Sequence, residues 1–252
     1  MIDTHAHLDF KHFDNDRDDV VSRAADAGVS FIINPGCDLA TTRKAVNLSE
    51  KYNSIYAAAG IHPNSTSEVR SGDFVEIARL AEHPKVIAIG ETGLDFYRDR
   101  SPKDIQIRAF RGQLDLAREL DMPVIIHFRN VEFDGIDLIG AEYFKGLRGV
   151  FHCFGGSREF ARKVVSMGYY IGFDGPLTYK NSDRIDIALD VPLEKCFLET
   201  DAPFLTPQKY RGERNEPAYV REVAVKMAEI KNCGIEEVIE VTGQNARTLF
   251  GI

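Results

Sequence analysis

The sequence lacks a long run of apolar residues. No stretch approaches the roughly 20 apolar residues that span a bilayer, so we expect no transmembrane helix. The first ten residues, MIDTHAHLDF, contain no basic region followed by an apolar run, so we expect no secretory signal. Cysteine is also scarce, because four cysteines stand far apart in 252 residues and form no CxxC pair. These absences predict a reduced cytoplasmic protein without a structural zinc knuckle and without a membrane partner.

Positive charge is in deficit as well. The chain has 31 Lys and Arg against 39 Asp and Glu, which gives a formal net charge of −8. A protein that coats nucleic acid by bulk charge needs a broad basic face, and this composition argues against one. The balance still permits an enzyme that binds a few phosphates locally.

Eight short apolar runs recur along the chain, and each is followed by a helix-like stretch. Several runs, such as KVIAIGE and MPVIIH, are continuously apolar, as in strands buried on both faces. The clearest helix is expected at 101–120, with Ser101 as its cap, Pro102 in the first turn and Asp104 at the capping-box position. The expected strands are 2–7, 29–34, 55–61, 86–91, 123–128, 149–153, 169–172 and 195–199.

This alternation predicts an α/β protein with a (β/α)₈ TIM-barrel fold, formed as a single domain by residues 1–252. A doubly wound open sheet is the alternative, but eight evenly spaced units without a GxGxxG motif favour a closed barrel. The last segment, 217–252, is expected to form two or three helices that close the barrel.

Five of the seven histidines stand within a residue or two of the end of an expected strand, and two carboxylates do the same. In a barrel, the C-terminal ends of the strands meet at one mouth, where catalytic residues lie. One such histidine is more often a satisfied core residue, whereas a whole set at one rim indicates a functional site. The set comprises His5, His7, His62, Glu91, His127, His152 and Asp201.

His5 and His7 stand two residues apart, so on a strand they point to the same side and can bind one metal ion. Without His62, the set supplies six ligands, which is more than one tetrahedral ion uses. Glu91 is the best candidate for a carboxylate that bridges two ions about 3.5–4 Å apart. We therefore expect a site for two divalent ions.

Eight motifs follow one another along the chain: DTHAHLD, AGIHP, IGETGLDFY, PVIIHFR, VFHCFGG, LETDAPFLTP, RGERNEP and GQNARTLF. Together, from residue 3 to residue 250, they resemble the TatD family of metal-dependent deoxyribonucleases, which belongs to the amidohydrolase superfamily of barrels. One segment departs from the family pattern. Family members usually follow the fifth-strand histidine with a small polar residue, Arg, an acidic residue and Ala. This chain has Phe128, Arg129, Asn130 and Val131, which implies a different pocket wall.

The resemblance implies two ions that share Glu91. It also implies that Asp201 is the general base or orients the attacking water, and that His62 contacts the substrate phosphate. Four imidazoles favour zinc, manganese, iron or nickel by their softness, whereas the family is commonly described as magnesium-dependent, so Mg, Mn and Zn stay open. The implied ligands are His5, His7, Glu91 and Asp201 for one ion, and Glu91, His127 and His152 for the other.

Further residues are candidates for substrate binding. Arg129 can hold phosphate oxygens in a bidentate manner, and Arg211 can contact another phosphate. Tyr97 and Phe154 can stack on bases in a sequence-tolerant way. Loop packing is the alternative for the two aromatic residues, and a solvated face is the alternative for Arg211.

We therefore predict a two-metal hydrolase that cleaves phosphodiester bonds of DNA, a 3′–5′ exonuclease that prefers single-stranded ends and needs no organic cofactor. Asp201 and Glu91 are its expected catalytic residues. An amide, lactone or aminoacyl-ester hydrolase of the same superfamily is the alternative. A non-catalytic nucleic-acid-binding barrel is a third hypothesis, and it is disfavoured because a binding protein has no use for six convergent metal ligands.

Overall fold

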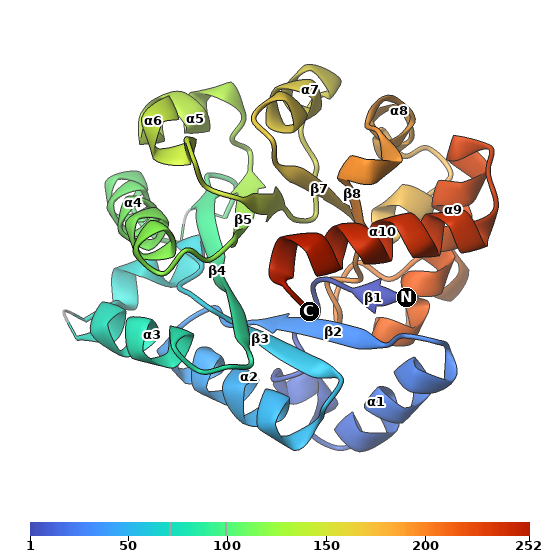
Figure 1. Ribbon diagram of the computed structural model, residues 1–252, viewed down its shortest axis with the longest axis horizontal. Coiled ribbons are helices and arrows are strands. Elements are labelled where there is room, and N and C mark those ends of the chain that lie inside the picture. The colour runs from blue at the N-terminus through green and yellow to red at the C-terminus, as the bar shows by residue number, and fades with distance from the viewer. Residues whose placement is uncertain (71, 99) are drawn as a thin grey trace.

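The structure, a computed structural model, describes residues 1–70, 72–98 and 100–252. Its centre is one parallel sheet in which the eight strands follow one another in chain order (Figure 1). The strands are β1 (Ile2–Asp3), β2 (Phe31–Pro35), β3 (Ile55–Ala59), β4 (Val86–Asp95), β5 (Val124–Arg129), β6 (Gly149–Phe151), β7 (Tyr170–Phe173) and β8 (Cys196–Leu198).

Helices connect the strands and surround the sheet (Figure 1). The sequence fixes the start of α2, where Asp38 and Thr41 form a capping box and the Asp38 carboxylate accepts the Thr41 N–H at 2.7 Å. The α-helices are α1 (Arg17–Asp26), α2 (Leu39–Lys51), α3 (Asp73–Ala81), α4 (Lys103–Glu119), α5 (Phe133–Ile139), α6 (Ala141–Phe144), α7 (Arg158–Ser166), α8 (Arg184–Asp190), α9 (Val220–Lys231) and α10 (Ile235–Phe250). The 3₁₀ helices are η1 (Lys11–Phe13), η2 (Pro63–Glu68), η3 (Gly175–Thr178), η4 (Leu193–Lys195), η5 (Gln208–Tyr210) and η6 (Pro217–Tyr219).

The sheet closes between its first and last strands. Just beyond β1 and β8, Ala6 pairs with Ala202 in a parallel bridge. The buried Asp3 carboxylate accepts hydrogen bonds from the backbone N–H and the hydroxyl of Thr200, at 3.0 and 2.7 Å. The predicted (β/α)₈ barrel is therefore confirmed.

One end of the barrel is closed by α10, which crosses the centre of the sheet in Figure 1. Residues from seven strands form one apolar cluster with three residues of this helix. The predicted helical closure by segment 217–252 is confirmed. The opposite end of the barrel, where the C-terminal ends of the strands meet, is open for a functional site. The cluster contains Ile2, Ile33, Ala58, Ala88, Ile125, Val150 and Phe197 from the strands, and Ala246, Leu249 and Phe250 from α10.

The first and fourth strands end four residues away from their predicted ends, and the other strand boundaries lie within two residues of the prediction. The first strand ends at Asp3, and the residues beyond it keep only isolated bonds to Ile33 of β2, to the end of β8 and to the segment after it. The fourth strand extends to Asp95, which still pairs with β5. Ser101 does not cap α4, since its hydroxyl oxygen accepts the Ser67 N–H at 3.1 Å and the helix begins at Lys103.

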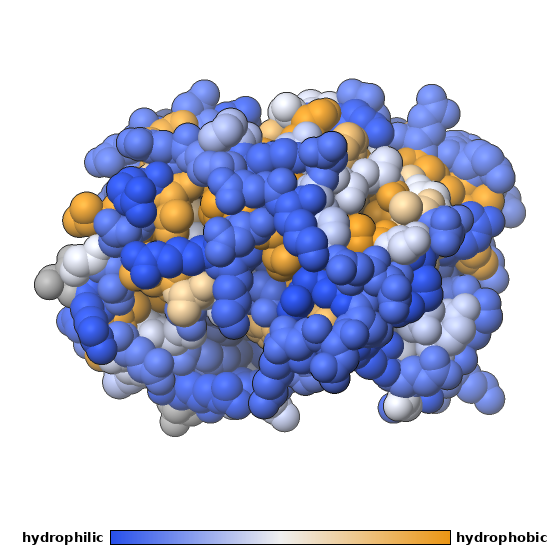
Figure 2. Space-filling view, turned by 90° about the horizontal axis from the view of Figure 1, so that it is seen from below, coloured by the Kyte–Doolittle hydropathy of each residue, from blue (hydrophilic) through white to orange (hydrophobic). Residues whose placement is uncertain are grey.

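The surface is mainly polar. Figure 2 shows a face that is largely hydrophilic, with hydrophobic residues in scattered patches. In the described part of the chain, no helix combines the length and the apolar character that a membrane crossing requires.

Gly93 lets β4 and β5 approach each other closely beside the site. Its φ of 142° is rare for residues with a side chain, and a Cβ there would collide with the backbone oxygen of His127. Gly112, inside α4, offers a contrast, because a Cβ there would meet only a Phe74 ring carbon at an ordinary 3.6 Å.

We expect Gly93→Ala to lower the free energy of unfolding by about 3 kcal/mol or more, through backbone strain and overpacking. Gly112→Ala is the matched control and should raise it by about 0.5–1 kcal/mol, because alanine favours a helix interior. Urea denaturation of both variants measures the difference. Equal stability of the two variants would contradict the close approach at Gly93.

Candidate active site

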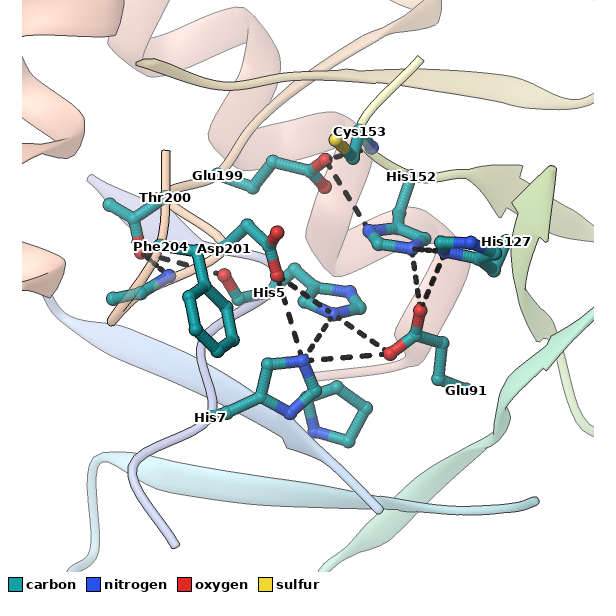
Figure 3. Close-up of polar contacts among 12 residues, drawn as sticks. His5, His7, Glu91, His127, His152, Cys153, Glu199, Thr200, Asp201 and Phe204 are labelled. Atoms are coloured by element: carbon teal, nitrogen blue, oxygen red, sulfur yellow. Dashed lines mark hydrogen bonds and ion pairs between the residues drawn. The ribbon is translucent and has the colours of Figure 1, made fainter. Parts of the chain in front are cut away.

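Polar side chains from the ends of five strands converge at the open mouth of the barrel (Figure 3). The mouth contains a cavity of about 1400 Å³. His5 and His7 follow β1 and Asp201 follows β8, so these three residues lie at the seam where the barrel closes. The structure brings together all six residues that the sequence suggested as metal ligands, His5, His7, Glu91, His127, His152 and Asp201.

The first cluster contains four ligand atoms. The Nε2 atoms of His5 and His7 lie 3.2 Å apart, and each is 3.4–3.5 Å from Oε2 of Glu91. Oδ1 of Asp201 lies 3.8 Å from His5 Nε2 and 3.6 Å from His7 Nε2.

The second cluster contains three ligand atoms. Oε1 of Glu91 lies 3.0 Å from Nδ1 of His127 and 2.8 Å from Nε2 of His152. The two imidazole nitrogens are 3.1 Å apart. Glu91 therefore turns one oxygen toward each cluster, as a bridging carboxylate does.

These distances fit a divalent metal ion. An ion with tetrahedral bonds of about 2.0–2.1 Å separates its ligand atoms by about 3.3 Å. The separations are 3.2–3.8 Å in the first cluster and 2.8–3.1 Å in the second. Among the described residues the second cluster offers three protein ligands, so an ion there would keep a position for water or substrate.

The histidines of the first cluster are in the form that binds metal. Burial lowers the pKa of His7 to about 4, and burial together with the nearby His152 lowers the pKa of His5 well below its ordinary value. Both imidazoles are therefore neutral at pH 7 and can offer a lone pair without first losing a proton.

Charges in the second cluster depend on one another. Burial alone would raise the pKa of Glu91, but electrostatic interactions with His152 and His62 and a hydrogen bond from His127 hold that pKa well below its ordinary value. Burial opposes the protonation of His127, yet hydrogen bonds with Asp95 and Glu91 outweigh it and raise the pKa of His127 to about 9. Without a metal ion, a proton on His127 balances the negative charge of Glu91. A bound metal ion would replace that proton.

Asp201 differs from Glu91 in the direction of its pKa shift and in the exposure of its side chain. Burial and the charge of Glu91 raise the pKa of Asp201 well above its ordinary value, which makes this carboxylate a good proton acceptor. Its side chain is 16 % exposed and lines the cavity, whereas that of Glu91 is 3 % exposed. Asp201 is the more accessible of the two carboxylates to a water molecule.

Two carboxylates that the sequence analysis missed stand behind the second cluster. Asp95 Oδ2 lies 3.4 Å from Nε2 of His127, and Glu199 Oε1 lies 3.9 Å from Nδ1 of His152. A carboxylate behind a histidine orients the ring and makes it a better ligand. Glu199 ends the expected strand 195–199, so the rule that selected Glu91 and Asp201 had the signal to find it. Asp95 lies four residues beyond the expected end of the fourth strand and became visible only because β4 extends to it.

Cys37 is a third residue that the sequence analysis did not assign to the site. Its Sγ lies 3.9 Å from Nδ1 of His7 and 4.0 Å from Oε2 of Glu91. Burial and the charge of Glu91 raise the pKa of this thiol well above its ordinary value. Cys37 therefore stays protonated beside the first cluster and is not poised as a thiolate ligand.

His62 presents a hydrogen-bond donor to the site. Its Nδ1 accepts the backbone N–H of Asn64 at 3.0 Å, and burial lowers its pKa, so the neutral ring carries its proton on Nε2. That nitrogen lies 3.4 Å from Oε1 of Glu91. A donor in this position suits a phosphate oxygen.

The structure brings two of the four other predicted substrate-binding residues to the cavity. Arg129 and Tyr97 both line it, and the guanidinium carbon lies 4.3 Å from the centre of the Tyr97 ring. Phe154 is 4 % exposed and packs on Phe160, so it offers no face to a base. Arg211 is exposed and its guanidinium lies over Tyr179, outside the cavity lining.

The backbone around the cavity is strained. Six described residues other than glycine have a positive φ, and four of them line the cavity. Such conformations cost energy and occur mainly where the surrounding structure holds a functional site in place. The four residues are Asn130, Cys153, Asp201 and Leu205.

Comparison with known families gives one match over nearly the whole chain. The model of the family described as TatD related DNase matches residues 2–251. A crystal structure of YJJV, a TatD homologue from Escherichia coli K12, superposes with a TM-score of 0.94 at 32 % sequence identity. That superposition covers 100 % of this chain and 98 % of the homologue.

Two bacterial proteins show the range of related functions. The uncharacterized metal-dependent hydrolase YabD of Bacillus subtilis is 42 % identical over 253 residues, which cover 100 % of this chain and 99 % of YabD. The 3′-5′ ssDNA/RNA exonuclease TatD of Shigella flexneri serotype 5b is 37 % identical over 258 residues, which cover 100 % of this chain and 99 % of that exonuclease.

Proposed function

The chain belongs to the TatD-related DNase family and is a metal-dependent hydrolase that acts on ester bonds, and we propose that its substrate is DNA. In this proposal it removes nucleotides from the 3′ end of single strands, with two divalent ions, Mg, Mn or Zn, bound per chain. The prediction of an enzyme is confirmed, and the hypothesis of a non-catalytic nucleic-acid-binding barrel is wrong.

One observation favours a phosphodiester as the substrate over an amide or a lactone. The Arg129 guanidinium lies at the same cavity as the two clusters, and among the described residues no carboxylate pairs with it. A cation held over Tyr97 without an anionic partner suits a phosphate that carries negative charge. A neutral amide or lactone gains little from such a group.

The proposal assigns the first cluster to one ion and the second cluster to the other. Divalent ions there supply positive charge to the nonbridging phosphate oxygens and lower the pKa of an attacking water. Asp201 accepts or orients the proton of that water through its exposed carboxylate edge. Glu91 bridges the clusters from its buried position, and its two oxygens fix their separation.

Substrate binding in the proposal depends on two donors outside the ligand set. The Nε2–H of His62 and the Arg129 guanidinium hold phosphate oxygens, which orients the scissile bond. Tyr97 supports the Arg129 guanidinium through its ring. Phe154 and Arg211 have no part in this proposal, because neither side chain is presented to the cavity.

Two ions per chain are expected when the gently purified protein is saturated with metal and subjected to elemental analysis. His127→Ala should lose one ion and keep the ion of the His5/His7 cluster. His83→Ala, which changes a histidine paired with Glu50 on the surface, is the control and should keep both. A wild-type value that never exceeds one ion, or the loss of both ions in His127→Ala, would contradict the two-ion assignment.

Asp201→Asn should lower kcat by a factor on the order of 10²–10⁴, because the amide cannot accept the proton of the attacking water. Circular dichroism should show an intact fold. Asp121→Asn is a matched control, since Asp121 has a similar φ of 50° against 54° for Asp201 and its exposed side chain pairs with Arg148 on the surface. Near-wild-type turnover of Asp201→Asn would remove Asp201 from the mechanism.

Arg129→Ala should raise KM for single-stranded DNA by the equivalent of about 1.5–3 kcal/mol, the value of a hydrogen bond to a charged group. Metal content should not change, and KM should depend less on salt because one fewer phosphate is neutralised. Arg108→Ala, on the exposed face of α4, is the control. If Arg129→Ala cleaves DNA like the wild type at every salt concentration, Arg129 is structural.

A further inference from the structure

Exposed aromatic side chains gather at one place on this protein. Among the described residues, seven large hydrophobic side chains are exposed, and three of them are aromatic: Tyr97 (62 %), Phe133 (43 %) and Phe204 (45 %). All three line the cavity at the mouth of the barrel, and none of the four aliphatic ones does. An exposed aromatic ring keeps apolar surface in contact with water, so this concentration indicates a surface that binds a planar apolar group.

Phe204 is the aromatic residue tied most closely to the first cluster (Figure 3). It stands three residues after Asp201, and its N–H donates to the Asp201 carbonyl at 2.9 Å. Its own carbonyl accepts the Asn215 side-chain amide at 2.6 Å, and the same amide donates to the Thr200 carbonyl at 2.8 Å. These bonds hold the backbone of Asp201 and Phe204 in one turn, so Phe204 is anchored beside the first cluster.

The Phe204 ring is 45 % exposed and has only edge-type ring contacts among the described residues. Phe10 and His12 approach it at large angles, 68° and 76°, with ring centres 6.1 and 5.8 Å away. In the described part of the chain, no ring stacks in parallel on Phe204. Phe10 in turn stacks on His7, at 4.6 Å and 13°, so a continuous row of rings leads from the first cluster to Phe204.

The cavity therefore has two unlike walls. Since the strands follow one another in order, the β4–β5 side, which carries Tyr97 and Arg129, lies across the barrel from the seam that carries Phe204. The β4–β5 wall presents the Arg129 cation over the Tyr97 ring, and the seam wall presents the Phe204 ring. A nucleotide has the same two parts, an anionic phosphate and a planar base.

We propose that Phe204 is the stacking surface for the nucleobase next to the scissile phosphodiester, an assignment that rests on the proposed DNA substrate. Every base has a π-face, so this contact tolerates any sequence. A base inside a duplex is already stacked on both sides and cannot use Phe204. The ring thus provides a physical source for a preference for single strands.

The test combines a variant with a modified substrate. Phe204→Leu keeps an apolar side chain but removes the ring, and it should lower kcat/KM on single-stranded DNA by about 5- to 150-fold. Phe204→Tyr keeps the ring and should stay near the wild type. Leu189→Ala, at an exposed residue outside the cavity, is the control and should have no effect.

The second part of the test uses oligonucleotides that carry one abasic nucleotide, placed last or next to last at the 3′ end. One of these positions should cost the wild type the same factor as Phe204→Leu, and Phe204→Leu should lose nothing further on that strand. Independent, multiplicative losses at both positions would overturn the assignment. Metal content and melting temperature of Phe204→Leu should match the wild type. If this variant does not fold, the wild type alone still tests the proposal: an unchanged kcat/KM on both abasic strands overturns it.

The experiment separates the two proposals. A wild-type protein with full metal that cleaves no DNA overturns the proposed function and the stacking assignment together. A wild-type protein that cleaves DNA but loses no rate with either abasic strand overturns the stacking assignment alone.

Discussion

The structure depends on a buried carboxylate that cannot keep its charge without positive partners. Glu91 is 2 % exposed, yet its two oxygens face imidazoles on both sides. An isolated charge at such a depth costs far more than the net stability of a domain, so positive charge must accompany it. Protons on histidine or bound metal ions are the two sources, and the clusters on either side of Glu91 are shaped for the second. The buried charge of Glu91 is therefore compatible with the metal dependence of the family.

The seam of the barrel is the second constraint. Asp3 is buried and is held by Thr200, and the His5 carbonyl accepts the Asp201 N–H at 2.9 Å. These bonds place candidate metal ligands from the beginning and the end of the chain side by side. The geometry of the first cluster is therefore set by the same hydrogen bonds that close the sheet, and a change that loosens closure must also disturb the cluster.

Much of the site was predictable because one rule, polar residues at strand ends, depends only on where strands stop. His5 and His7 obey it although β1 ends at Asp3, since the seam holds the following residues in an extended course. What the sequence could not give is the path of the loops. Cys153 has a φ of 45°, and after this turn Phe154 packs into the core instead of lining the cavity. Phe204 stood in a motif that the sequence analysis had already used, but only the folded turn shows that its ring is exposed.

The seam has a consequence for the order in which the protein matures. Every ligand of the second cluster lies between residues 91 and 152, so this half of the centre is complete in the nascent chain before the last strands are synthesised. The first cluster waits for Asp201, which follows β8. An ion bound there would link ligands from the earliest and the latest parts of the polypeptide. Under the proposed two-ion assignment, loading of that ion would follow the synthesis of β8 and would mark a chain whose barrel has closed.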